Sequence, residues 1–198
     1  MKFGVLGTGM VGSALAKKLA KLGHDVKVGS RTPDAAKSQE LGLPVGTYAE
    51  AAKHGEWIVN ALPGEPAIGY LEQCELGDKI FIDISNYYSA VDQPIETPIG
   101  ELIQRAFPKL RLVKALNSVS AHLMVDPTHL GKPHTVFVAG NDAAAKTAVS
   151  DLLRTFGWAD IIDLGDVGAF RAMEQLIPLW MALERVTRGT HFNLEVAR

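Results

Sequence analysis

The sequence predicts an α/β protein with a doubly wound, mostly parallel sheet and a small C-terminal helical addition. Three observations predict this fold class. Short buried strand patterns alternate with amphipathic helix patterns along most of the chain. The first strand pattern runs directly into a glycine-rich turn, residues 7–12, which opens a helix. A long and mostly apolar segment, residues 169–188, follows the last strand pattern.

The elements expected in the first half alternate between strand and helix. Apolar Val11, Leu15 and Leu19 share one face of the first helix, and Gly23 is its expected C-cap. Thr32 is the expected N-cap of the second helix, with Pro33 at its first position. Strands are expected over residues 3–6, 25–28, around 45, 57–62 and 79–84, and helices over residues 10–22, 33–41 and 48–53.

The second half begins with an aperiodic segment, residues 87–100, which holds tyrosines and prolines and is expected to be a functional loop. Helices are then expected over residues 101–107, 142–156 and 169–188, and strands over residues 111–116, 135–139 and 161–164. The last helix is apolar on more than one face, so it packs on the sheet or in a dimer interface, which we favour. We therefore expect a nucleotide-binding domain over residues 1–165, a helical segment over residues 166–198, and a homodimer.

Composition excludes several classes of protein. The chain has 198 residues, of which 47% are hydrophobic and 21% charged, and its net charge is −2. These values are typical of a globular protein without a basic field for nucleic acid or an anionic membrane. The single cysteine, Cys74, excludes an internal disulfide framework. The apolar stretch before Gly7 is too short for a signal peptide, and no apolar run reaches membrane-spanning length. We expect a cytoplasmic protein.

The glycine-rich turn carries the first functional motif. Its residues match the pattern G-x-G-x-x-G between a strand and a helix, and they are Gly7, Thr8, Gly9, Met10, Val11 and Gly12. In such a turn the glycines permit a tight bend, a close approach to a pyrophosphate, and close packing of helix on strand. The N–H groups at the helix N-terminus then face the anion. This motif predicts a Rossmann-type dinucleotide site, and the alternative is a plain strand-to-helix turn.

The end of the second strand indicates which dinucleotide binds. Sites for NAD usually place a carboxylate there, to hold the ribose 2′-hydroxyl. This chain has Ser30, Arg31 and Thr32 instead, and its first carboxylate is Asp34. A guanidinium and small hydroxyls suit a 2′-phosphate, so we expect NADP(H). The alternative is that Arg31 is a solvated surface residue and Thr32 only a helix cap.

The other strand ends are expected to hold the nicotinamide half of the cofactor. Ligands of open parallel sheets lie beyond the carboxyl ends of the strands. The candidate residues at those ends are Ala61, Leu62, Pro63, Asn86 and Asn117. The alternative for each amide is turn formation, which asparagine also favours.

No catalytic acid or base can be assigned from the sequence. His122, His129 and His134 lie near the nicotinamide end, but no carboxylate is spaced to orient one of them, and they lack a zinc-binding spacing. Lys114 and Asn117 are one residue too close for the Lys-x-x-x-Asn pair of hydroxyacid dehydrogenases. Hydride transfer between two stacked rings needs proximity and orientation more than a positioned acid. A flavin-like acceptor would suit such a site.

Four segments together resemble the F420-dependent NADP oxidoreductases. They are residues 7–12 with 28–31, residues 113–117, residues 136–142, and residues 163–165, so the resemblance covers nearly the whole chain. It implies a Rossmann domain with a small C-terminal addition, a homodimer, and reversible hydride exchange between NADP(H) and a deazaflavin, coenzyme F420. It also implies phosphate binding by the backbone of Thr8, Met10 and Val11, and 2′-phosphate binding by Ser30 and Arg31.

Three functions remain open on the sequence. The first is an NADP(H)-dependent oxidoreductase that exchanges a hydride with a small-molecule flavin or deazaflavin. The second is a small-molecule dehydrogenase or imine reductase with an unrecognised base, for which His122 is a candidate. The third is a non-catalytic module that senses NADP(H). A pH profile should separate the first two, because ring-to-ring transfer should not depend steeply on one histidine.

Overall fold

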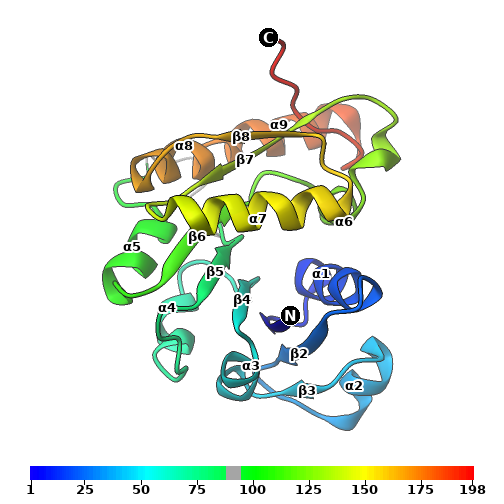
Figure 1. Ribbon diagram of the computed structural model, residues 1–198. Coiled ribbons are helices and arrows are strands. Elements are labelled where there is room, and N and C mark those ends of the chain that lie inside the picture. The colour runs from blue at the N-terminus through cyan, green and yellow to red at the C-terminus, as the bar shows by residue number, and fades with distance from the viewer. Residues whose placement is uncertain (88–94) are drawn as a thin grey trace.

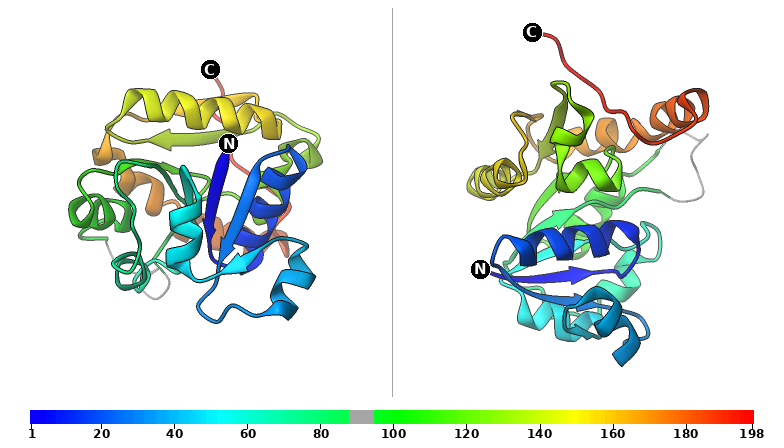
Figure 2. Two further views of the ribbon diagram at one scale, coloured as in Figure 1. Left: turned by 60° about the horizontal axis from the view of Figure 1, so that its bottom comes forward. Right: turned by 90° about the vertical axis from the view of Figure 1, so that its right-hand side faces the viewer.

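A computed structural model describes residues 1–87 and 95–198 and contains an eight-stranded sheet with the strand order β3-β2-β1-β4-β5-β6-β7-β8. Neighbouring strands pair in parallel, except for β6 and β7, which are antiparallel. Figures 1 and 2 show the first strands and the last strands at opposite ends of this sheet. The expected doubly wound α/β fold is confirmed. The strands are β1 (Lys2–Leu6), β2 (Asp25–Gly29), β3 (Val45–Gly46), β4 (Trp57–Asn60), β5 (Ile80–Asp83), β6 (Arg111–Ala115), β7 (Thr135–Ala139) and β8 (Asp160–Asp163).

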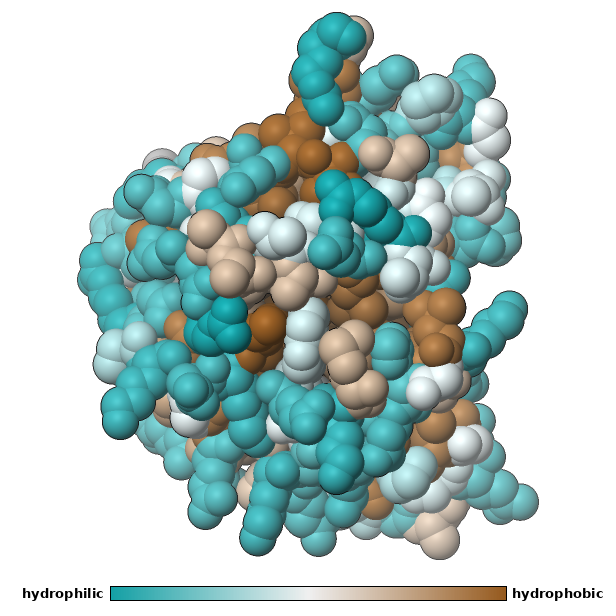
Figure 3. Space-filling model, viewed as in Figure 1, coloured by the Kyte–Doolittle hydropathy of each residue, from teal (hydrophilic) through white to brown (hydrophobic). Residues whose placement is uncertain are grey.

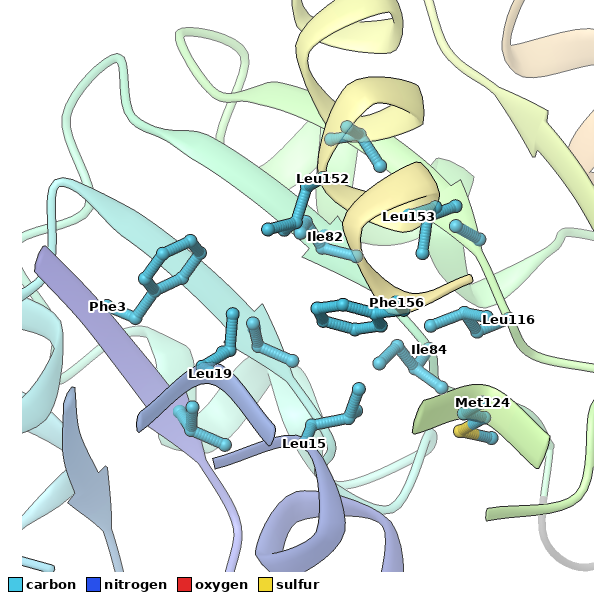
Figure 4. Close-up of a cluster of buried hydrophobic side chains, with 14 of the residues drawn as sticks. Phe3, Leu15, Leu19, Ile82, Ile84, Leu116, Met124, Leu152, Leu153 and Phe156 are labelled. Carbon is cyan, nitrogen blue, oxygen red and sulfur yellow. The ribbon is translucent and has the colours of Figure 1, made fainter. Parts of the chain in front are cut away.

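Helices cover both faces of the sheet and enclose two hydrophobic clusters. The cluster on the first face is packed under α1 (Met10–Lys21), α2 (Ala35–Leu41), α6 (Ala121–Val125) and α7 (Ala143–Phe156). Figure 4 shows Leu15 and Leu19 of α1 opposite Leu152 and Phe156 of α7 across this cluster. The cluster on the second face is packed under α3 (Tyr48–His54), α4 (Ala67–Leu71), α5 (Ile99–Ala106) and α8 (Phe170–Glu174). Two 3₁₀ turns (Pro127–Leu130 and Val167–Ala169) and α9 (Ile177–Thr187) complete the described elements.

A fully buried ion cluster joins the C-terminal segment to the sheet. Lys114 on β6 places its ammonium 2.8 Å from Asp83 on β5 and 2.9 Å from Glu174 at the end of α8. Glu174 also accepts hydrogen bonds from the backbone N–H groups of Ile99 and Gly100 at 2.9 and 3.0 Å, so it caps the first turn of α5. Because these contacts tie α8 to β5, β6 and α5, this first part of the C-terminal segment belongs to the packed core. The division of the chain at residue 165 stays a prediction.

The expected last helix is wrong as a continuous element. Instead of one helix over residues 169–188, the chain forms α8 up to Glu174 and α9 from Ile177. Pro178 explains the break, because a proline cannot donate to the carbonyl four residues earlier, and its ring clashes with that carbonyl.

Other differences are smaller. Asp34, not Thr32, caps α2, with its carboxylate accepting from the Lys37 N–H, so that helix begins at Ala35. Of the expected loop over residues 87–100, residues 88–94 lie outside the described part, and α5 already begins at Ile99. None of the helices in the described ranges is long and apolar enough to cross a membrane.

Candidate active site

A cleft of about 1290 Å³ opens beyond the carboxyl ends of β1, β2, β4, β5 and β6. It lies where the strand order passes from β1 to β4, which is the topological switch point where ligands of this fold bind. Every residue that the sequence predicts for the site lines this cleft, from the glycine turn to Asn117. Its volume exceeds the roughly 300–1,000 Å³ of ordinary ligand pockets, so a dinucleotide and a second small molecule can share it.

The glycine turn has the geometry of an anion cradle. Gly7 has a φ of +119°, which a residue with a side chain rarely adopts. A Cβ at Gly12 would lie 2.1 Å from the Gly7 carbonyl oxygen, so the helix can approach the strand only with glycine there. A Cβ at Gly9 would meet no atom within 4 Å, so Gly9 faces open space. Two glycines thus shape the turn, and the third leaves room for a ligand.

The N-cap residue of α1 supplies no side-chain hydrogen bond to this helix. Thr47 and Asp142 accept hydrogen bonds from the first turns of α3 and α7, whereas Gly9 gives α1 no side-chain acceptor and its first turn has no acidic residue. Free N–H groups at a helix N-terminus attract anions. The cleft therefore fits a dinucleotide pyrophosphate at this end.

A cationic corner closes the cleft beyond β2. The Arg31 guanidinium is hydrogen-bonded to the Tyr70 hydroxyl, which raises the pKa of Arg31. Tyr48 packs against Tyr70 with a ring-centroid distance of 5.3 Å. The buried Ser30 hydroxyl accepts from the Thr32 N–H at 3.3 Å. Arg31 is exposed, and its guanidinium contacts this aromatic pair at the mouth of the cleft.

The sequence did not predict three residues of this corner. Lys37 on α2 lines the cleft, and its ammonium donates to the Thr32 hydroxyl at 2.9 Å and pairs with Asp34 at 3.2 Å. Lys37 does have a signal in the sequence, because it is a cation in the helix that follows Arg31. Tyr48 and Tyr70 carried no such signal, because only the packing of α3 against α4 brings them to Arg31.

At the nicotinamide end, Asn86 and Asn117 are bound to each other. The Asn86 amide donates to the Asn117 carbonyl at 2.7 Å, and the Asn117 amide donates to Asn86 Oδ1 at 3.0 Å and to the Met173 carbonyl at 2.8 Å. Both amide hydrogens of Asn117 are therefore used, which leaves its side-chain oxygen to accept from a ligand. Leu116, just before it, has a φ of +61°, an uncommon conformation that clusters at functional sites.

The other half of the cleft is mostly apolar and is supplied by α6 with the residues before it and by the C-terminal segment. It is lined by Val119, Ala121, His122 and Met124, by Ile177, Trp180, Met181 and Glu184 of α9, and by Thr190. The Trp180 indole N–H is buried and has no hydrogen-bond partner among the described residues. This wall offers mainly flat and apolar surface, and Glu184 is the carboxylate among its residues.

Of the three candidate histidines, the structure places His122 in the cleft. Burial lowers the pKa of His122, and the charges of His191 and His129 lower it further. His134 is buried against Trp158 and bonds the Pro127 carbonyl at 2.9 Å, while His129 pairs with Asp126 on the surface. Lys114, which resembled half of a catalytic pair, belongs to the buried ion cluster instead.

The glycine cradle falls within a family match. The family described as NADP oxidoreductase, coenzyme F420-dependent, matches residues 2–87. A crystal structure from Arthrobacter sp. FB24, assigned provisionally as an F420-dependent NADP reductase, is 40% identical over the whole of both chains, with a TM-score of 0.93.

Two curated relatives are more distant. The F420-dependent NADP reductase of Methanocaldococcus jannaschii is 28% identical and is matched over 99% of this chain and 100% of its own length. The rat metalloreductase STEAP3 is 30% identical over 90% of this chain, but the chain spans only 38% of that protein. The glycine cradle, the cationic corner and the full-length match agree, and the chain belongs to the family of coenzyme F420-dependent NADP oxidoreductases.

Proposed function

We propose that the protein transfers a hydride between NADP(H) and a planar, flavin-like ring, of which coenzyme F420 is the favoured example. One observation carries this proposal: the anion cradle and the broad apolar wall face the same cleft at the switch point of the sheet. When bound, NADPH supplies the hydride, and the protein has to bring two rings face to face and exclude water. The names of the full-length relatives support the choice of acceptor.

The residues divide the binding task. The N–H groups of Thr8, Met10 and Val11 would hold the pyrophosphate, and Gly12 keeps α1 close enough to do so. Ser30, Arg31, Thr32 and Lys37 would hold the 2′-phosphate, with Lys37 leaving Asp34 to do so. The backbone of residues 61–63 and the Asn86–Asn117 pair would orient the carboxamide, so that the free ring face looks toward α9.

The decisive experiment is an acceptor panel. Purified protein and NADPH are mixed separately with F420, FMN, a ferric chelate and a cyclic imine, and loss of nicotinamide absorbance is followed. We expect turnover with F420 or FMN and none with the imine. Turnover with the imine alone would favour an imine reductase, and tight NADPH binding without any turnover would favour a sensor.

A matched pair of variants tests the cationic corner within the same assay. Lys37→Ala should raise the KM for NADPH several-fold and leave NADH almost unaffected, since Lys37 faces the 2′-phosphate position. Lys53→Ala, on α3 and outside the cleft, is the control. Equal losses for both cofactors would contradict the assignment of Lys37.

We also propose a homodimer that uses α9. This helix has no fully buried residue and exposes Leu179 by 48%, Met181 by 44% and Val186 by 71%. The face seen in Figure 3, which carries α7, is mostly hydrophilic, and α9 lies on the side of the molecule away from α7 (Figure 2, right). Light scattering should give twice the 21.3 kDa of the chain, and Val186→Asp should give the monomer. A wild-type monomer at micromolar concentration would refute the dimer.

The proposed compartment is the cytoplasm, where a lone thiol stays reduced. Burial raises the pKa of Cys74 to about 11, so this thiol is unreactive at neutral pH and needs no disulfide partner. Because this thiol is unreactive, labelling intact cells with a membrane-impermeant thiol reagent would not report on the compartment. Fractionation followed by the NADPH-dependent activity assay is the appropriate measurement, and activity confined to the culture medium would contradict the assignment.

A further inference from the structure

Two imidazoles with nearly parallel rings lie edge to edge beside the apolar half of the cleft. His122 on α6 and His191 in the C-terminal segment have a ring-centroid distance of 5.5 Å and an interplanar angle of 15°. His122 Nε2 and His191 Nδ1 are 3.3 Å apart, within hydrogen-bond distance. His122 lines the cleft, and His191 is exposed. The pair therefore spans the wall between the cleft and the solvent.

The C-terminal segment is anchored on both sides of His191, so this pairing is built into the fold. On one side, the Ser120 hydroxyl donates to the Thr190 carbonyl at 2.6 Å. On the other side, the Asn193 amide donates to the Thr135 carbonyl at 3.0 Å, and the Thr135 N–H donates to the Leu194 carbonyl at 2.8 Å. Three anchors within five residues fix the position of His191 over α6.

Each imidazole has two nitrogens, and the shared hydrogen bond uses one of each. Nδ1 of His122 therefore remains on the side chain that lines the cleft, and Nε2 of His191 remains on the exposed side chain. A neutral imidazole has one donor and one acceptor nitrogen, so a proton that arrives at one end can be released at the other. The titratable groups that act on His122 among the described residues are His191 and His129, and Glu184 lines the same cleft.

The proposed reaction needs such a proton. Reduction of a flavin-like ring by NADPH moves two electrons and one hydrogen as a hydride, and one further proton completes the product. NADPH, the acceptor and one proton thus become NADP⁺ and the acceptor carrying two added hydrogens. Among the residues that line this half of the cleft, His122 and Glu184 have side chains that can carry such a proton.

We propose that His122 and His191 form a proton relay between solvent and the hydride acceptor. A proton enters at Nε2 of His191, the shared hydrogen bond passes a proton to His122, and Nδ1 of His122 delivers one to the reduced ring. In the reverse direction the relay removes that proton. This inference rests on the proposed function, and it replaces the expectation that turnover would not depend on a histidine.

The test combines turnover with a measurement on the protein alone. His122→Gln should bind NADPH as the wild type does. Its turnover with F420 or FMN should fall about a hundredfold, the lower range for general acid catalysis. The slowing of turnover in D₂O that we expect of the wild type should be lost in this variant. His191→Ala should lose less and should regain turnover when imidazole is added to the buffer. His129→Gln is the matched control, because the charge of His129 also acts on His122 while its side chain lies outside the cleft. This variant should keep the turnover of the wild type. In NMR titrations without ligand, His191→Ala should raise the pKa of His122, because the charge of His191 lowers it.

The outcomes separate this inference from the proposed function. If the wild type reduces no planar acceptor although it binds NADPH, the proposed function fails and the relay fails with it. If the wild type turns over and His122→Gln keeps the same turnover and D₂O effect, the relay alone fails. An equal loss in His129→Gln, no rescue of His191→Ala by imidazole, or an unchanged His122 titration would also overturn it.

Discussion

Replacing Lys114 with methionine tests the ion cluster that holds the C-terminal segment on the sheet. Methionine keeps much of the volume of lysine but removes the ammonium that lies 2.8 Å from Asp83 and 2.9 Å from Glu174. All three side chains are fully buried, so the variant leaves two carboxylates without a cation. Breaking a buried ion pair in this way costs about 3–5 kcal/mol of unfolding free energy. For a chain of this length that corresponds to a fall of roughly 6–20 °C in Tm.

The pH dependence gives the prediction a sign. In the wild type, burial opposes the charge of Lys114, but Asp83 and Glu174 outweigh burial and raise its pKa. Its contribution to stability is therefore complete below the unfolded value, about 10.4, and is lost only as the pH rises through the higher folded value. In the variant, the two carboxylates are relieved by binding a proton, so the folded state binds more protons than the unfolded chain. The deficit of the variant, which is its loss of unfolding free energy relative to the wild type, should therefore become smaller as the pH falls.

Urea denaturation at pH 4.5 and pH 7.5 measures both quantities. The double variant Lys114→Met with Glu174→Gln is the control, because it removes one of the two uncompensated charges and should recover part of the loss. A deficit below about 1 kcal/mol at pH 7.5 would refute the reasoning, since that is the scale of an exposed pair. A deficit that grows on acidification would refute it as well.

Three further predictions concern the cradle, the corner and a helix cap. Arg31→Ala should weaken NADPH binding by about 1.5–3 kcal/mol in a fluorescence titration and change NADH binding little; equal losses would contradict a 2′-phosphate contact. Gly12→Ala should abolish binding of both cofactors, because its Cβ would lie 2.1 Å from the Gly7 carbonyl oxygen, and calorimetry showing normal binding would contradict the cradle geometry. The hydrogen bond from Arg111, with that from the Ala145 N–H, lowers the pKa of Asp142 to about 2; Asp142→Asn keeps an oxygen for the cap but loses the charge that faces Arg111, so it should cost about 1 kcal/mol above pH 4. That cost should vanish as the pH falls through 2, and an acid-independent cost would count against it.

The nucleotide half of the site could be predicted because its signals are local. The glycine turn, the strand before it and the helix after it are adjacent in sequence, and Arg31 follows the next strand directly. The alternating strands could be predicted for the same reason, because each is a short pattern of adjacent residues. The same locality also explains the misses: α4 and α6 have five residues each, too few for a helical period to stand out.

The second half of the site depends on contacts between distant segments. Lys114 meets Glu174 sixty positions later in the chain, and His122 meets His191 sixty-nine positions later. Neither pairing leaves a pattern in a single sequence, so nothing in the sequence connects Lys114 to Glu174 or His122 to His191. Pro178 lies in the last apolar segment, but the apolar pattern continues on both sides of it. The pattern therefore predicts one helix where the chain forms α8 and α9.

The division of the cleft into a nucleotide half and an apolar half affects how the acceptor is chosen. The family match ends at residue 87 and so contains the glycine cradle and the cationic corner, but none of α6, α9 or the C-terminal segment. Those three elements line the apolar half of the cleft, where the second ring would bind. A protein can therefore keep the NADP(H) half and exchange the other wall, because different segments of the chain line the two halves of the cleft. Acceptor specificity in this chain should reside in Trp180, Met181 and the His122–His191 pair. Substitutions there should change which acceptor is reduced without changing the affinity for NADPH.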